Sequence, residues 1–97
     1  MKRTNAKSMG ELLQHFYEEH PQIRQKLMEV SVQRAWHEML GRTVSHATRD
    51  LYIKDRTLYV SLNSSVIRNE LLMHQEKIVA KLNERAGEEV IRRMVIR

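Results

Sequence analysis

The sequence contains no cysteine, one proline and three glycines among its 97 residues. Without cysteine it has no disulfide, no thiol nucleophile and no zinc site built on thiolates. Neither a glycine-rich phosphate loop nor the Gly-x-Ser-x-Gly or His-Glu-x-x-His pattern of known hydrolases occurs. The residues that follow Met1 lack the apolar run that an export signal requires. We therefore expect a cytoplasmic protein that is not an enzyme and needs no cofactor.

The sequence also shows no grouping of residues typical of a metal site or of catalytic carboxylates. The five histidines are dispersed along the chain, whereas zinc needs three or four converging ligands. The acidic pairs Glu18/Glu19 and Glu88/Glu89 stand beside predicted helix ends, where solvated surface charge is a simpler interpretation than acid-base chemistry. We expect no metal site, and we expect the protein not to associate with membranes.

What the sequence does contain is an excess of positive charge. Its formal net charge is +5, which attracts polyanions and nucleic acid first among them, although proteins that are merely soluble can carry the same charge. Residues 41–97 carry 11 Lys/Arg against 7 Asp/Glu, whereas residues 1–40 carry 6 against 5. The hydrophobic content of 41% is typical of a folded domain. We expect one domain over residues 8–97, preceded by a flexible basic arm at residues 1–7.

Hydrophobic residues recur at helical spacing in the first 40 residues. The segment Ser8-Met9-Gly10-Glu11 matches a capping box and predicts a helix over residues 9–19. Pro21 separates this helix from a second one over residues 22–40, which Gly41 ends. We expect Trp36, on the second helix, to pack that helix against a sheet, because a tryptophan buries a large apolar area.

After Gly41 the hydrophobic period changes to two, which predicts strands over residues 51–54 and 58–62 with a tight turn at Asp55-Arg56. Asn63-Ser64-Ser65 offers N-cap side chains for a long third helix over residues 66–86, which Gly87 ends. Residues 90–97 are β-branched and predict a terminal strand. The order α-α-β-β-α-β predicts an α+β fold in which helices cover one face of a three-stranded sheet.

Basic and aromatic residues of the second half are candidates for binding nucleic acid. Lys77, Lys81 and Arg85 stand four residues apart and form a positive stripe along the third predicted helix. A solvated face balanced by Glu76 and Glu84 is the simpler interpretation. Alternatively, the stripe binds phosphates together with the arginines of the terminal strand, which are Arg92, Arg93 and Arg97. Tyr52 and Tyr59 are candidates for stacking on single-stranded bases.

A set of short segments recurs in an order and spacing that resemble the DciA-like family of bacterial proteins. The segments are Trp36 with Gly41, His46-Ala47-Thr48-Arg49, Leu58-Tyr59-Val60, Ser64-Ser65 before Glu70-Leu71, Lys81-Leu82-Asn83 with Gly87, and the ending from Ile91 to Arg97. The resemblance runs from about Met9 to Arg97 and implies a fold similar to the KH domain of the second type. It also implies association with DNA and with the replicative helicase, which members of the family help to load.

The chain also departs from these families. Ile67 stands where DciA-like proteins often have an aromatic residue, and the long flexible extension that many members carry is not among these residues. None of the three glycines has a second glycine three residues on, so the Gly-x-x-Gly phosphate clamp of KH domains is missing. We therefore expect a nucleic-acid surface that differs from that of a KH domain.

Together these observations predict an accessory protein of the replicative helicase that binds DNA, or alternatively RNA, by its backbone and with little sequence preference. We expect a monomer or a weak homodimer. The competing hypothesis is a protein-protein interaction adaptor whose basic face meets an acidic helicase surface and which does not bind nucleic acid directly.

Overall fold

The computed structural model describes the backbone of residues 6–97 and the side chains of residues 9–97. Its elements are α1 (Ala6–Glu19), α2 (Pro21–Met39), α3 (Gly41–Ala47), β1 (Thr48–Lys54), β2 (Thr57–Leu62), α4 (Ser65–Leu72), α5 (Gln75–Ala86) and β3 (Arg93–Ile96). The α+β class is confirmed, and so is the order of predicted elements, with two refinements. The short helix α3 follows α2, and the predicted third helix is divided into α4 and α5.

The first helix starts earlier than expected. It begins at Ala6, so Ser8 lies inside the helix and is not its N-cap. Alanine and lysine are strong helix formers, and Ala6 and Lys7 therefore extend the helix toward the N-terminus. These two residues belonged to the predicted flexible arm, and the remainder of that arm, residues 1–5, lies outside the described part of the chain.

The three strands form one mixed sheet in the order β1-β2-β3. Strands β1 and β2 are antiparallel and are joined by the predicted turn, in which Asp55 and Arg56 have φ angles of 51° and 61°. Such left-handed conformations favour glycine or asparagine, which explains why the sequence signal for this turn is weak. The terminal strand is confirmed, begins at Arg93, and pairs parallel with β2 because α4 and α5 cross over between them.

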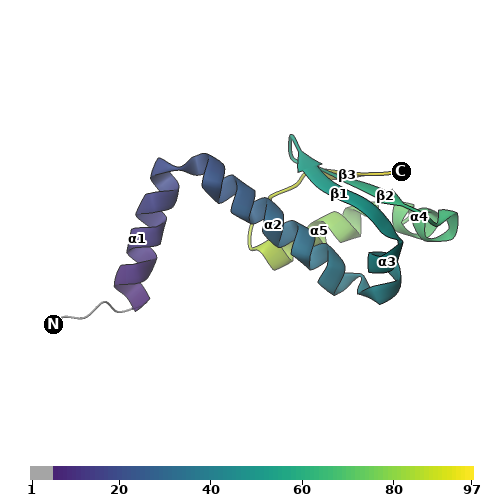
Figure 1. Cartoon of the computed structure of the whole chain (residues 1–97), viewed down its shortest axis with the longest axis horizontal. Coiled ribbons are helices and arrows are strands. Elements are labelled where there is room, and N and C mark those ends of the chain that lie inside the picture. Colours follow the sequence, from purple (N-terminus) through teal and green to yellow (C-terminus); the bar gives the residue numbers. More distant parts are fainter. Residues whose placement is uncertain (1–5) are drawn as a thin grey trace.

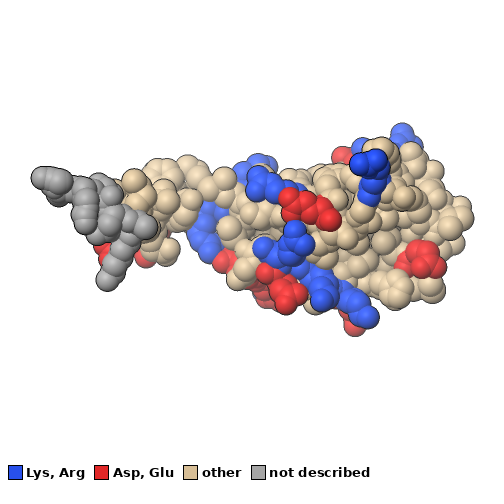
Figure 2. All heavy atoms as spheres, turned by 90° about the horizontal axis from the view of Figure 1, so that it is seen from below, with Lys and Arg blue, Asp and Glu red and all other residues tan. Residues whose placement is uncertain are grey.

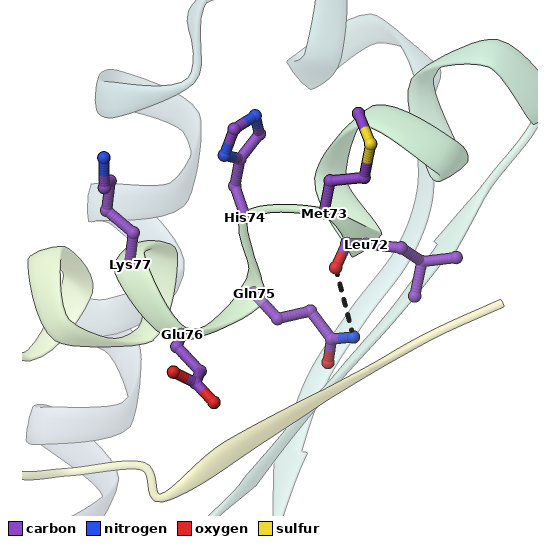
Figure 3. A pocket seen from close by; sticks show the side chains of 6 residues that line it. All are labelled: Leu72, Met73, His74, Gln75, Glu76 and Lys77. Carbon is purple, nitrogen blue, oxygen red and sulfur yellow. Dashed lines mark hydrogen bonds between the residues drawn. The ribbon is translucent and has the colours of Figure 1, made fainter.

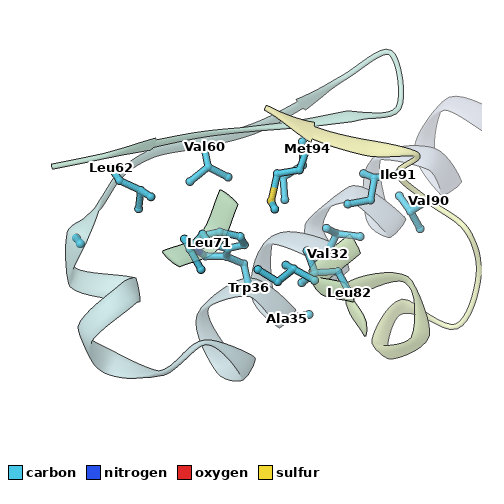
Figure 4. Close-up of a cluster of buried hydrophobic side chains, with 13 residues drawn as sticks. Val32, Ala35, Trp36, Val60, Leu62, Leu71, Leu82, Val90, Ile91 and Met94 are labelled. Carbon is cyan, nitrogen blue, oxygen red and sulfur yellow. The ribbon is translucent and has the colours of Figure 1, made fainter. Parts of the chain in front are cut away.

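The helices cover one face of this sheet and leave the other face open (Figure 1). The covered face presents Leu58, Val60 and Met94, which pack with Trp36 of α2 and Leu82 of α5 in one buried cluster (Figure 4). The predicted role of Trp36 is confirmed, since its side chain is fully buried between α2 and the sheet. One face of the sheet is therefore committed to the core, and most side chains of the other face are at least partly exposed.

The break between α4 and α5 falls at Met73 and His74. Ser64 caps α4 as predicted, with its hydroxyl accepting a bond from the Ile67 N–H at 3.2 Å. Leu71 and Ile78 both face the core, and their spacing of seven residues also fits a continuous helix. The hydrophobic period therefore contains no signal for the break. In the structure α4 contacts β2 and β3, whereas α5 packs along α2.

An ion pair joins the first turns of α2 to the segment that follows α5. Arg24 donates two hydrogen bonds to the carboxylate of Glu88. This hydrogen bonding lowers the pKa of the Glu88 carboxyl below its ordinary value and raises the pKa of Arg24. Both side chains are about 40% exposed, so solvent screens the pair and we assign it little stabilising free energy. Glu88 thus carries solvated charge, as the sequence suggested.

Candidate nucleic-acid interface

The open face of the sheet carries three rows of side chains that run across the strands. The rows are Lys54–Thr57–Arg93, Tyr52–Tyr59–Val95 and Asp50–Ser61–Arg97. The third row extends to Arg97 because its N–H donates to the Val60 carbonyl and its own carbonyl accepts from the Leu62 N–H. The rows contain three basic side chains and one acidic side chain. We call this surface the open face, and it is electropositive with an aromatic centre.

The two tyrosines lie in the middle row as a stacked pair. Their ring centroids are 4.9 Å apart and the ring planes differ by 12°. The guanidinium carbon of Arg97 lies 5.1 Å from the centre of the Tyr59 ring, and its Nη2 donates to the Tyr52 hydroxyl at 2.8 Å. Tyr52 is on the edge strand β1 and remains 38% exposed. The exposed Tyr52 ring is therefore available to stack on a nucleic-acid base.

Arg92 and Arg93 lie at the start of β3, beside a shallow depression of about 350 Å³ between that strand and α5. Its other lining residues are Gln75, Glu76, Val79 and Met94. Arg93 also donates from Nε to the Thr57 hydroxyl at 3.4 Å, which holds its side chain over the first row of the open face. Arg93 therefore belongs to both surfaces and makes them continuous around the edge of the sheet.

The α4–α5 junction forms a second surface hollow, of about 550 Å³ (Figure 3). Gln75 and Glu76 point toward the side on which β3 runs, whereas His74 and Lys77 point to the opposite side (Figure 3). The Gln75 side chain donates to the Leu72 carbonyl at 3.5 Å and so bridges the two helices. Lys77 is thus turned away from Arg92 and Arg93, although all three are near the start of α5.

The stripe of Lys77, Lys81 and Arg85 follows the flank of α5 that faces α2. Arg85 donates to Glu38 of α2 at 2.8 Å, so its balancing charge comes from another helix and not from the glutamates beside it in sequence. Lys77 and Lys81 are exposed and form no ion pair with any described residue. Seen from the helix side, basic and acidic side chains are interspersed (Figure 2). This flank is consequently less uniform in charge than the open face.

The structure therefore divides the candidate residues into two sets. Tyr52, Tyr59, Arg93 and Arg97 share the open face, and Arg92 adjoins it at the edge of the sheet. Lys77 points to the other side of α5, and Lys81 and Arg85, which follow it at intervals of four residues, lie on the same helix flank. The sequence does not reveal this separation, because it depends on how α5 is rotated against the sheet.

One further basic residue joins the open face. Lys54 stands in the same row as Arg93, is exposed, and forms no ion pair within residues 9–97. Strand alternation puts Lys54 on the same side of β1 as Tyr52, but a lysine at a strand end carries no signal of binding by itself. Its alignment with Arg93 appears only once β2 and β3 are paired.

The basic and aromatic side chains of the two surfaces are of the kinds that bind nucleic acid. Arginine and lysine side chains contact phosphates, and tyrosine rings stack on bases. Within the described residues, no group of three or more His, Asp or Glu side chains is placed to hold a metal ion. No helix of residues 6–97 is long and apolar enough to cross a membrane.

Comparison with known proteins gives one result. The family model described as "Dna[CI] antecedent, DciA" matches residues 8–96, nearly the whole chain. No curated protein and no solved structure matches it.

Proposed function

The chain belongs to the DciA family, and from this membership we propose that it is a nucleic-acid-binding accessory protein of the replicative helicase. Membership supports a role in replication similar to that of a helicase loader. The observation that carries the nucleic-acid part of the proposal is the stacked pair of Tyr52 and Tyr59 with Arg97, at the centre of an electropositive and uncovered sheet face.

In this proposal a single strand lies across the open face. Lys54, Arg93 and Arg97 contact phosphates, and a base stacks on the exposed ring of Tyr52. A duplex has its bases paired and stacked internally and cannot use the tyrosines in this way. The protein therefore binds single strands more tightly than duplexes and shows little sequence preference, because every base has a face that can stack.

Paired charge reversals test which surface binds. We expect Arg93→Glu with Arg97→Glu to weaken binding of a labelled single-stranded oligonucleotide at least about tenfold, and to reduce the slope of log affinity against log salt by roughly 1 to 2. The matched variant is Lys77→Glu with Lys81→Glu, which changes the net charge equally on the helix flank. Fluorescence anisotropy at low and near-physiological salt measures the affinity of each variant and its salt dependence.

The four results of that titration have different meanings. Loss of affinity in the first variant alone supports the open face. Loss of affinity in the second variant alone places the binding site on the helix flank. Equal losses of affinity in both variants indicate attraction by net charge without a defined site. An unmodified protein that binds no oligonucleotide even at low salt contradicts the nucleic-acid proposal. It would favour the adaptor, which a pull-down of helicase after nuclease treatment then tests.

A second prediction separates stacking from charge. Tyr52→Ala removes the exposed ring and should weaken single-strand binding by roughly 5- to 150-fold, the usual range for one stacked base. Tyr52→Phe keeps the ring and loses only the hydroxyl that accepts from Arg97, so its affinity should stay close to that of the unmodified protein. Equal affinities of the Ala and Phe variants, measured by the same titration, would exclude a stacking role for Tyr52.

A further inference from the structure

The two edges of the sheet differ in how their backbone groups are occupied. Strands β1 and β3 are the outer strands, and an outer strand turns alternate N–H and C=O groups away from its neighbour. At the middle of β1, the Leu51 N–H donates to Oδ1 of Asp50 and the Leu51 carbonyl accepts from Nε2 of Gln33, both at 3.1 Å. A β-bulge between Thr48 and Asp50 further disturbs this edge. The β1 edge is therefore poorly suited to pair with another strand.

The β3 edge has no such protection. Hydrogen bonds to the β2 side hold both ends of this segment, because the Arg92 N–H donates to the Arg56 carbonyl at 2.7 Å and the Arg97 N–H donates to the Val60 carbonyl at 2.8 Å. Within residues 6–97, no side chain and no helix donates to or accepts from the backbone of Arg93–Ile96. The outward N–H and C=O groups of β3 can therefore pair with an added strand.

The depression of about 350 Å³ between β3 and α5 lies directly beside this edge. Val79 of α5 and Met94 of β3 supply its apolar lining, and Val79 is only half-buried. An extended peptide paired with β3 would turn alternate side chains into the depression and the others toward the open face. Strand addition combines main-chain hydrogen bonds with pockets for alternate side chains, and the β3 edge offers both.

The charge along β3 indicates which kind of strand fits. Residues 92–97 contain three arginines and no acidic residue, and all three arginines are exposed. None of them forms an ion pair with another described residue. One acid, Glu76, lines the depression from α5, so the arginines outnumber it. Pairing β3 with the β3 of a second copy would bring arginines together, whereas an acidic strand brings opposite charges together.

We propose that β3 docks an acidic segment of a partner protein, which binds in extended conformation as an additional strand of the sheet. The backbone of the segment pairs with β3, and its apolar side chains enter the depression beside Val79. Its carboxylates contact Arg92 and Arg93, which lie on either side of the added strand. Protein recognition at β3 does not depend on nucleic-acid binding, although Arg93 belongs to both surfaces.

Anisotropy of a fluorescein-labelled peptide of alternating valine and glutamate, titrated with the full chain, tests this docking. We expect saturable binding at low salt, and no binding of a matched peptide of alternating valine and lysine. Arg92→Glu should weaken binding by about tenfold, because repulsion replaces attraction. Lys81→Glu makes the same charge change on the far flank of α5 and should have little effect. Circular dichroism of each variant checks that the fold is retained.

A variant with the opposite expected effect tests the role of charge in the depression. Glu76→Gln removes the one acid that lines it and should tighten binding of the valine–glutamate peptide by about two- to fivefold, the size of one exposed charge contact. Unchanged or weaker binding would contradict the placement of the peptide beside α5.

Backbone methylation of the peptide tests strand pairing separately from charge. Methylating alternate amide nitrogens gives two peptides, and in only one of them do the methyl groups face β3, because alternate N–H groups of a strand point to opposite sides. We expect the affinities of the two peptides to differ at least about tenfold. Equal affinities, or no binding of the unmethylated peptide at low salt, would overturn the docking of a strand at β3.

Two further outcomes separate this site from the nucleic-acid surface. A protein that binds the peptide but no oligonucleotide supports docking at β3 and contradicts only the nucleic-acid proposal. An Arg92→Glu variant that keeps its affinity for the peptide and loses its affinity for a single strand would assign the depression to nucleic acid and overturn the peptide site.

Discussion

Replacing Trp36 by alanine should lower the free energy of unfolding by about 3–5 kcal/mol, the range observed for large aromatic residues in cores. Trp36 is fully buried where α2 meets the sheet, so alanine leaves a cavity that neighbours on several elements would have to close together. A domain of this size is stable by only about 5–15 kcal/mol, so the variant should lose a large fraction of its stability. Urea unfolding followed by circular dichroism measures the change without relying on tryptophan fluorescence.

Two milder variants separate packing from hydrogen bonding at the same position. The indole Nε1 donates to the Thr48 hydroxyl at 3.0 Å, and that hydroxyl donates to the Val44 carbonyl at 2.7 Å. Thr48→Val keeps the volume but leaves the indole N–H without its acceptor, at a cost of about 1–3 kcal/mol. Trp36→Phe keeps part of the side-chain volume, so its free energy of unfolding should lie between those of the native protein and of Trp36→Ala. A Trp36→Ala protein as stable as the native one would contradict the central place of Trp36 in the core.

Replacing Asn83 by alanine should cost about 2–4 kcal/mol, because one side chain satisfies three backbone groups. Its Oδ1 accepts from the N–H groups of Val90 and Ile91 at 2.9 and 3.1 Å. Its Nδ2 donates to the Ile91 carbonyl at 2.8 Å. Val90 and Ile91 are buried, so water does not easily replace these bonds. Asn83 thereby ties the end of α5 to the segment that leads into β3.

The consequences of the Asn83 change should be greatest at β3. Urea unfolding gives the overall loss, and hydrogen exchange should show faster exchange of the Arg97 and Leu62 amides, whose bonds join β2 to the end of the chain. Asn83→Asp keeps both acceptor bonds and loses the donor bond, so it should be intermediate. Asn69→Ala, at an exposed position of α4, is the control. If Asn83→Ala cost no more than this control, the three bonds would not hold β3 in place.

Much of the fold follows from local sequence patterns, since these describe what each segment does by itself. The alternation along residues 51–62 predicted β2 and the second half of β1, although β1 begins three residues earlier, at Thr48. Ser64 predicted the start of α4, and Gly87, with a φ of 91°, predicted the end of α5 because only glycine adopts that conformation at little cost.

Other features depend on contacts between segments that are distant in the chain. The break at Met73 and His74 arises because α4 packs on β2 and β3 while α5 packs on α2, and no local pattern marks it. In the same way, Arg85 pairs with Glu38, which is 47 residues away, and not with the glutamates of its own helix. Sequence patterns report the nearest neighbours of a residue, and here the decisive neighbours are on other elements.

The sequence by itself determined the α+β class, the positive charge, the family and the residue types available for binding. Only the tertiary structure decided how these residues are grouped. It joined Tyr52, Tyr59 and Arg97 across three adjacent parts of the sheet, and it turned Lys77 to the opposite side of α5. The physical reason is that composition and period fix which face of an element is apolar, whereas strand register and helix packing fix which faces meet.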